Sequence, residues 1–221
     1  MTLQKPNVKN LALLLLLVIV LLISGCAQQK PVELKGIEVD NYNGEKLSSV
    51  NDFRENSIKG PQSIDANSYR LEITGLVENQ KTYTYEQVLS HQKYSKVVTL
   101  NCVEGWSVTI LWEGVLVRDL ISEAKAKPEA KTVIFYAQDG YSTSFPIEYL
   151  TNDILMAYKM NNATLPAERG FPFQLVAEDK WGYKWIKWIT KIELSGDTNY
   201  KGYWEQRGYN NAGDLNKSKY E

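Results

Sequence analysis

At 221 residues, with 43% hydrophobic and 23% charged residues, the chain has the composition of a packed globular protein. Its 25 Lys and Arg residues nearly balance its 26 Asp and Glu residues, which excludes the broad basic surface that neutralises nucleic-acid phosphates, so no nucleic-acid partner is expected. With one His and two Cys, metal sites built from several His or Cys ligands are excluded as well.

Residues 1–26 have the order of an export signal peptide. Lys5 and Lys9 precede an apolar run from Leu11 to Ile23, which is shorter than the roughly 20 residues of a membrane-spanning helix. We therefore expect cleavage, with an uncleaved anchor as the alternative. The segment Ile23-Ser24-Gly25-Cys26 resembles the lipobox of bacterial lipoproteins. This resemblance implies a lipid on Cys26 and a protein held at the extracytoplasmic face of the cell membrane.

A lipid on Cys26 leaves Cys102 without a partner for an intrachain disulfide. Residues 27–50 are rich in Asn, Lys, Glu and Ser, which predicts a flexible tether between the membrane and a domain over residues 51–221.

Short strands dominate the predicted domain. The alternation of Tyr69, Leu71 and Ile73 predicts a half-buried strand over 69–75, and Thr84 is the expected N-cap of a helix over 85–90. The polar stretch after residue 200 contains several aromatic residues and is expected to pack on the body. We predict a mixed, strand-rich single domain of the α+β class. Further strands are expected over 96–101, 132–137, 141–145, 154–160, 171–177 and 185–194, an apolar β-branched stretch over 106–116, a helix over 117–126 and a helical turn over 147–150.

Cys102 follows the predicted strand 96–101 and enters a turn with Val103, Glu104 and Gly105. A thiolate at this place is a suitable ligand for a soft or high-valent metal centre. Taken alone, a single Cys beside Val and Leu is more often a small buried hydrophobic residue. A nucleophilic Cys102 is a third interpretation, which requires a base, and His91 after the helix over 85–90 is the one histidine available. We expect His91 to be solvated.

Three stretches resemble the sulfite oxidase family of molybdopterin-binding proteins. Residues 99–120, with Cys-Val-Glu, Trp-Ser and Trp-x-Gly, are similar to the segment in which a cysteine binds molybdenum, especially in bacterial periplasmic enzymes that reduce methionine sulfoxide. Residues 169–188 resemble the second cofactor segment, with its Gly-x-Pro turn and its Gly-x-Lys-x-Ile-Lys pattern. Residues 51–55 look like a third motif, in which Arg54 replaces Tyr. The resemblance covers about residues 50 to 195 and implies the sulfite oxidase molybdopterin-binding fold.

The resemblance implies Mo-molybdopterin as the cofactor, with Cys102 as catalytic residue and metal ligand. Arg169 stands where relatives have Asn or His, and Gln174 where they have an arginine for the cofactor phosphate. We therefore expect Arg169 to supply the positive charge that Gln174 lacks. Lys184 could assist. The cofactor contacts implied by the resemblance are Asn51, Arg54, Glu55, Cys102, Arg169, Gln174, Trp185, Ile186 and Lys187.

These features predict a lipid-anchored oxidoreductase that moves an oxo group between the metal and a substrate. No Cys-x-x-Cys-His haem motif is present, so a separate electron-transfer partner is expected, in the membrane near the anchor. No arginine cluster for an anionic substrate can be assigned, which argues against sulfite. The n-region has no arginine pair of the kind that exports folded, cofactor-loaded proteins. The alternative is therefore a non-catalytic ligand- or protein-binding domain on the same fold.

Overall fold

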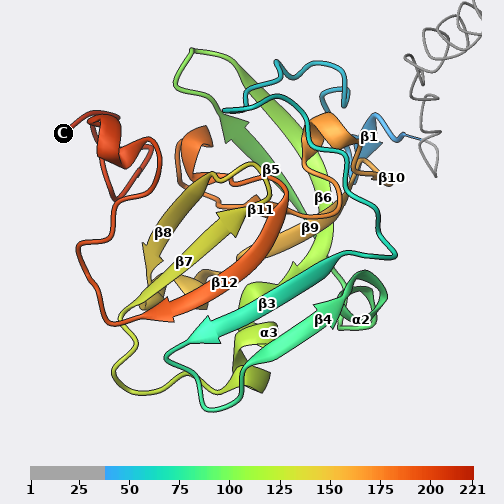
Figure 1. The fold of residues 1–221 in the computed structure, drawn as a ribbon. Coiled ribbons are helices and arrows are strands. Elements are labelled where there is room, and N and C mark those ends of the chain that lie inside the picture. The colour runs from blue at the N-terminus through green and yellow to red at the C-terminus, as the bar shows by residue number, and fades with distance from the viewer. Residues whose placement is uncertain (1–37) are drawn as a thin grey trace, which may run out of the picture. The chain divides into compact units, whose positions relative to one another are not determined.

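The computed structural model of the protein describes residues 38–221, which form one compact unit (Figure 1). The predicted signal peptide, Cys26 and residues 27–37 of the predicted tether lie outside the described residues. Within residues 38–221, no helix has the length and apolar character needed to cross a membrane.

Two five-stranded sheets make up the body, and in Figure 1 the second lies in front of β5, β6 and β9 of the first. The first sheet is antiparallel and has the order β10 (Ala163–Thr164), β9 (Leu155–Met160), β6 (Ser107–Leu116) and β5 (Tyr94–Asn101), with β11 (Gln174–Val176) also paired to β9. The second has the order β4 (Lys81–Thr84), β3 (Arg70–Gly75), β12 (Ile189–Ser195), β7 (Thr132–Ala137) and β8 (Ser142–Pro146). Within it, β12 runs parallel to β3 and antiparallel to β7. The prediction of a strand-rich α+β fold is confirmed.

One hydrophobic core joins the two sheets. On β3, Leu71 and Ile73 are fully buried while Arg70 and Glu72 are exposed, which confirms the alternation predicted for this strand. The same core cluster contains Ile110 and Met156 of the first sheet. Because both sheets bury one face in a shared cluster, the positions of their strand ends are fixed relative to each other.

The helices are short. The helix α2 (Tyr85–Leu89) begins at the predicted N-cap: the Gln87 N–H donates to Thr84 Oγ1 at 3.2 Å, and the Thr84 N–H donates to Gln87 Oε1 at 2.8 Å. The helix α3 (Val117–Ala124) buries one face against the core. Four 3₁₀ turns complete the set: η1 (Ile147–Asn152), η2 (Ala167–Arg169), η3 (Gly182–Lys184) and η4 (Glu205–Arg207).

The predicted tether is wrong for residues 38–50, which pack on the body. They form a two-residue hairpin of β1 (Asn41–Tyr42) and β2 (Glu45–Lys46), followed by the buried residues Leu47 and Val50. The Ser48 N–H donates to the Thr109 carbonyl at 2.8 Å. Backbone hydrogen bonds hold much of this segment, and a polar composition does not reveal them.

Two predicted strands are shorter in the structure, and both lie where the chain bends around the site. The strand expected over 185–194 begins only at Ile189, because Trp188 adopts a left-handed conformation with φ of 53°. Local bonds, such as the Trp185 N–H donating to the Gly182 carbonyl at 3.0 Å, replace a strand ladder there. The strand expected over 171–177 is reduced to β11.

The segment after β12 packs on the body as predicted, with Glu205 at 1% exposure. In Figure 1 this red segment turns back and rises beside β8.

Candidate active site

A cavity of about 250 Å³ lies against the Cys102 turn. Stretches distant in sequence line it: residues within 53–58, 100–106, 139–141, 168–188 and 204–209. Both Cys102 and Lys187 contribute to this lining. The residue expected as metal ligand and the residue expected as a cofactor contact therefore line one cavity.

The hairpin between β5 and β6 sets the position of Cys102. After the Asn101–Ser107 pair, the Cys102 N–H donates to the Trp106 carbonyl at 2.9 Å, and the Gly105 N–H donates to the Cys102 carbonyl at 3.0 Å. Gly105 has φ of 88°, a conformation that glycine adopts without strain. The turn holds the Cys102 side chain at the cavity with 8% exposure, as a free thiol.

Burial raises the pKa of the Cys102 thiol, and the nearby Glu104 carboxylate adds to this effect. The Glu104 backbone N–H and the Asn56 amide, 3.8 Å from the sulfur, favour the thiolate but do not outweigh burial. A thiol kept neutral in this way is a poor nucleophile, whereas a metal cation would displace its proton.

His91 is not placed to act as a base for Cys102. It is 15% exposed rather than solvated, and its ring Nε2 lies 3.0 Å from Glu123 Oε1. The ring Nδ1 lies 2.9 Å from the Gln87 carbonyl oxygen. Since both nitrogens are engaged away from the cavity, the interpretation of Cys102 as half of a Cys/His pair loses its base.

Lys187 supplies a positive charge to the cavity lining. Its ammonium lies 2.9 Å from Glu55 Oε1 and donates to the Glu168 carbonyl at 3.2 Å. Burial lowers the pKa of Lys187, and the ion pair with Glu55 opposes that shift. The neighbouring Trp185 and Ile186 are buried and also line the cavity.

Arg169 and Gln174 lie next to Lys187 and line the same cavity. The Arg169 guanidinium donates to the carbonyls of Val50 at 3.2 Å and Phe53 at 3.1 Å. Gln174 is 3% exposed, and its Oε1 is buried with no hydrogen-bond partner in the described part of the protein. A buried acceptor that faces a cavity without a donor is suited to a ligand that brings one.

Gly170 allows this close arrangement. A Cβ atom there would lie 3.0 Å from the Lys187 Cβ and 3.2 Å from the Gln174 Cβ, and φ at Gly170 is 99°. The glycine of the Gly-x-Pro turn therefore lets these two cavity-lining side chains come together.

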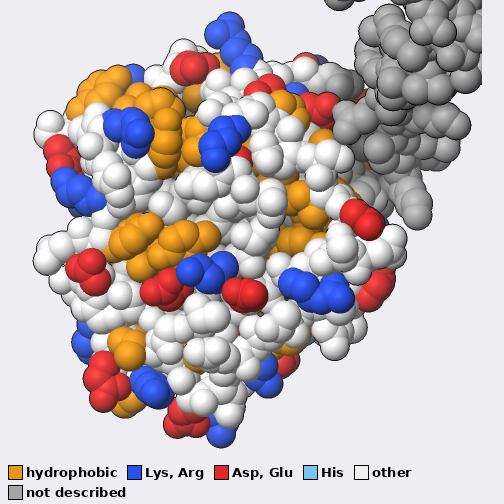
Figure 2. Space-filling view, in the orientation of Figure 1, with side chains coloured by type: hydrophobic (Ala, Val, Ile, Leu, Met, Phe, Trp, Pro, Cys, Tyr) orange, Lys and Arg blue, Asp and Glu red, His pale blue; other side chains and the backbone are white. Residues whose placement is uncertain are grey.

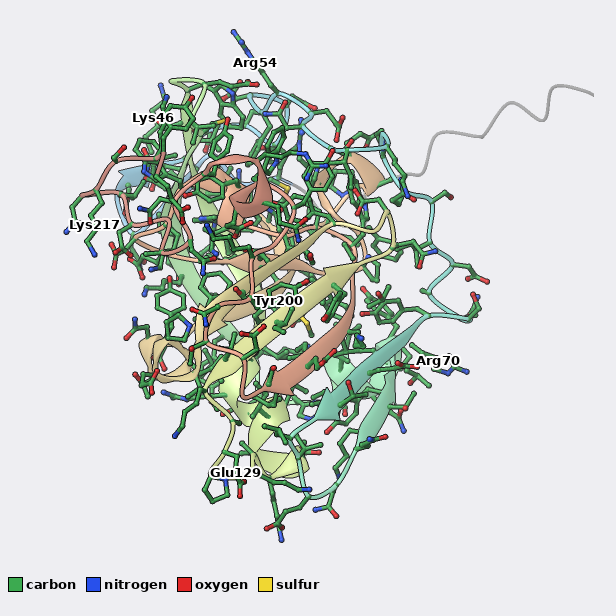
Figure 3. All side chains as sticks on the ribbon, turned by 60° about the vertical axis from the view of Figure 1, so that its left-hand side comes forward. Lys46, Arg54, Arg70, Glu129, Tyr200 and Lys217 are labelled. Atoms are coloured by element: carbon green, nitrogen blue, oxygen red, sulfur yellow. The ribbon has the colours of Figure 1, made fainter. Side chains whose placement is uncertain are left out.

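The motif at residues 51–55 lies farther from the cavity than the resemblance implied. Arg54 lines the rim, but its side chain extends away from the body in Figure 3. Asn51 and Glu55 are exposed and do not line the cavity, although Glu55 reaches it through Lys187. Lys184 points elsewhere: its fully buried ammonium pairs with Glu205 at 2.7 Å.

Several site residues were not identified from the sequence. An aromatic wall lies beside Cys102, and Trp204 and Tyr209 in it come from the segment after β12. Burial and a hydrogen bond with Tyr220 raise the pKa of Tyr209, and the nearby Glu104 carboxylate adds to the shift. The aromatic residues of this segment were the signal for packing, but nothing in their spacing indicated the cavity. The other unidentified lining residues include Phe53, Asn56, Trp106, Asp139, Tyr141 and Tyr183.

Comparison with known proteins decides the family. A family model described as the oxidoreductase molybdopterin binding domain matches residues 58–204. The chain belongs to this family. An "Uncharacterized oxidoreductase YuiH" of Bacillus subtilis is 33% identical over 156 residues, which are 70% of this chain and 78% of the relative.

Other family members are longer than this chain. A protein-methionine-sulfoxide reductase catalytic subunit MsrP of Campylobacter jejuni is 31% identical over 65% of this chain and 54% of its own length. The chain thus spans about half of that relative. The crystal structure of the sulfane dehydrogenase SoxCD of Paracoccus pantotrophus superposes with a TM-score of 0.63 at 20% identity, covering 79% of this chain and 55% of that one. The likeness confirms the fold.

Membership of this family implies Mo-molybdopterin as the cofactor, and the cavity residues fit it. The Cys102 thiol lines the cavity and would be the protein ligand for the metal, and Lys187 with Arg169 would offer cations for a phosphate. The unpartnered Gln174 Oε1 offers an acceptor for an N–H of the pterin. Residues 38–221 contain no cluster of three or more His, Cys, Asp or Glu side chains that would hold a metal without such a cofactor.

Proposed function

We propose that the protein is a molybdopterin-dependent oxidoreductase that transfers an oxo group to or from its substrate. The observation that supports this most directly is the shared cavity, whose lining includes a buried free thiol, Cys102, together with Lys187 and Arg169. When bound, the cofactor supplies two-electron redox chemistry at molybdenum. The protein supplies the ligand, the charges and a half-buried aromatic wall.

The residues around Cys102 favour an uncharged substrate. The Glu104 carboxylate lies two residues from the thiol, where it accepts a hydrogen bond from Trp106 Nε1 at 3.2 Å. Tyr209 also lines the cavity, and burial and its hydrogen bond with Tyr220 raise its pKa, so its hydroxyl adds no charge to this side of the site. The Glu104 carboxylate would repel an anion such as sulfite, whereas it would not repel a neutral sulfoxide. We propose a sulfoxide, with methionine sulfoxide suggested by the names of relatives.

The location of the enzyme is proposed from its sequence. The lipobox-like segment ending at Cys26 supports a lipid anchor at the extracytoplasmic face of the cell membrane. A chain whose cysteines are Cys26 and Cys102 has no haem attachment motif, which supports a separate, membrane-bound electron-transfer partner. On the face shown in Figure 2, basic and acidic side chains are interspersed, in keeping with the expectation of no nucleic-acid partner.

The decisive test is the metal and pterin content of protein purified from its native host. We expect one molybdenum per chain in the wild type and its loss in Cys102→Ser with an unchanged circular dichroism spectrum. Ser95→Ala, an exposed change on β5, is the matched control and should retain the metal. Wild-type protein without molybdenum would refute the enzymatic proposal and favour the non-catalytic alternative. Because the pterin dithiolene can hold the metal by itself, it is molybdenum retained in Cys102→Ser with an unchanged electron paramagnetic resonance spectrum that would refute the ligand role.

A further inference from the structure

Residues 208–221 form a small ribbon beside the site. Tyr209 and Tyr220 make an antiparallel bridge, and their ring centroids lie 5.1 Å apart. The Asn210 N–H donates to the Lys219 carbonyl at 3.0 Å, and the Glu221 N–H donates to the Gly208 carbonyl at 3.1 Å. The two arms of this segment therefore move as one piece.

The ribbon contacts the site at two places. On one arm, Tyr209 lines the cavity. On the other arm, the ammonium of the half-buried Lys219 donates to the Val103 carbonyl at 2.8 Å. Val103 directly follows Cys102 and lines the same cavity. The ribbon thus contributes Tyr209 to the cavity wall and, through Lys219, contacts the turn that carries Cys102.

A buried ion pair anchors the ribbon. The Lys184 ammonium lies 2.7 Å from Glu205 Oε1 and donates to the Asn211 carbonyl at 2.9 Å. Glu205 and Asn211 flank Tyr209 in sequence, so both ends of its loop are fixed to the cofactor segment that contains Lys187. Because the ribbon is fixed in this way, the Lys219 hydrogen bond can restrain the Cys102 turn. A lysine on an unanchored segment would move with the turn and could not restrain it.

We propose that Lys219 is a positioning residue for Cys102: through the Val103 carbonyl it holds the thiol-bearing turn in its metal-binding conformation. This inference rests on the proposed role of Cys102 as metal ligand. Within the turn, residues 102–106 make two backbone hydrogen bonds of their own, one to each side of Cys102. The Val103 carbonyl takes part in neither, and the charge-assisted bond from Lys219 restrains it from outside.

Three variants of the full chain test this inference. Lys219→Met removes the donor, and Lys219→Arg restores a cationic donor. Lys217→Met is the matched control, because Lys217 lies on the same ribbon but its side chain is 61% exposed and pairs with Asp214 rather than with the Cys102 turn. In metal-free protein at one fixed pH, we expect iodoacetamide to alkylate Cys102 about tenfold faster in Lys219→Met, the factor that corresponds to about 1.4 kcal/mol of lost restraint. Lys219→Arg and Lys217→Met should react at the wild-type rate.

Metal-loaded protein gives a second readout. The electron paramagnetic resonance spectrum of molybdenum should change in Lys219→Met and return to the wild-type form in Lys219→Arg, because the spectrum reports how the thiolate is oriented. Unchanged alkylation in Lys219→Met, or equal acceleration in Lys217→Met, would overturn the positioning role. If wild-type protein holds no molybdenum, the proposed function fails, but the alkylation rates still decide whether Lys219 restrains the turn.

Discussion

The buried ion pair between Lys184 and Glu205 makes a strong prediction about stability. Both side chains have 0% exposure, and the ammonium donates to Glu205 Oε1 at 2.7 Å and to the Ser144 carbonyl at 2.7 Å. Burial lowers the pKa of Lys184, and the Glu205 carboxylate opposes this shift. Glu205 Oε2 is buried without a hydrogen-bond partner in the described structure. The Thr143 hydroxyl also donates to Glu205 Oε1 at 2.7 Å, but it is neutral, so within the described residues the opposite charge that the carboxylate contacts is that of Lys184.

Lys184→Met should lower the free energy of unfolding by about 3–5 kcal/mol, because it leaves a carboxylate charge buried and unpaired. The double variant Lys184→Met/Glu205→Leu removes both charges and should recover most of this loss, since apolar side chains of similar volume often replace a buried pair at little cost. Lys191→Met is the control. Its ion pair with Glu193 is about one-third exposed on each side, so its loss should cost about 1 kcal/mol or less.

Equilibrium unfolding in urea, followed by tryptophan fluorescence, measures all three variants. A loss below about 1 kcal/mol in Lys184→Met, the size of a surface pair, would refute the argument from burial. A double variant as unstable as the single one would show that lost packing, rather than the unpaired charge, causes the effect.

Three further predictions follow from the contacts. Arg169→Gln should reduce the pterin content of the purified protein and increase proteolysis near residue 50, whereas Arg169→Lys should keep part of the pterin; full retention in Arg169→Gln would contradict the assigned role. Burial alone would raise the pKa of Asp214, but hydrogen bonds from Lys180 and Lys217 hold it below its ordinary value. Asp214→Asn should therefore cost about 1 kcal/mol near neutral pH, and its difference from wild type should vanish as acid protonates the carboxylate; a pH-independent difference would contradict this. Gly114→Ala would place a Cβ 2.4 Å from the Met156 carbonyl oxygen, so the free energy of unfolding should fall by about 1–3 kcal/mol, and an unchanged urea midpoint would disprove the close approach.

The sequence predicted the regular elements better than the segments that bend around the site. Leu71 and Ile73 alternate with exposed residues, and Thr84 caps its helix, because these signals are local and short-range forces decide them. Trp185 and Trp188 also carry a strand-like pattern of large apolar residues. Their backbone nevertheless leaves the extended region, because it must carry Lys187 to the cavity while both rings stay buried. Such a conflict between local preference and function is visible only in three dimensions.

The site shows the same division. Cys102 and Lys187 were identified through family motifs, and the structure brings both to one cavity. Lys184 fits the same motif, but its direction depends on Glu205, which lies beyond the matched segment and provides its buried partner. Tyr209 belongs to no motif. It reaches the cavity that Cys102 lines because the chain reverses its direction after β12. Contacts between residues this far apart depend on the packing of the whole chain, which no local pattern records.

The arrangement of Arg169 shows how one side chain can serve both the fold and the cofactor. A guanidinium has five N–H donors in a planar fork, and two of its nitrogens here hold the carbonyls of Val50 and Phe53. Donors therefore remain for an anion in the cavity, so the charge missing at Gln174 can come from Arg169 without releasing the segment it holds. Lys187 differs, because its ammonium already pairs with Glu55. Of its three N–H donors, one remains after the bonds to Glu55 and to the Glu168 carbonyl. A phosphate can take that donor, but it brings a second negative charge close to Glu55, so cofactor binding should loosen Glu55 while Arg169 keeps residues 50–53 in place.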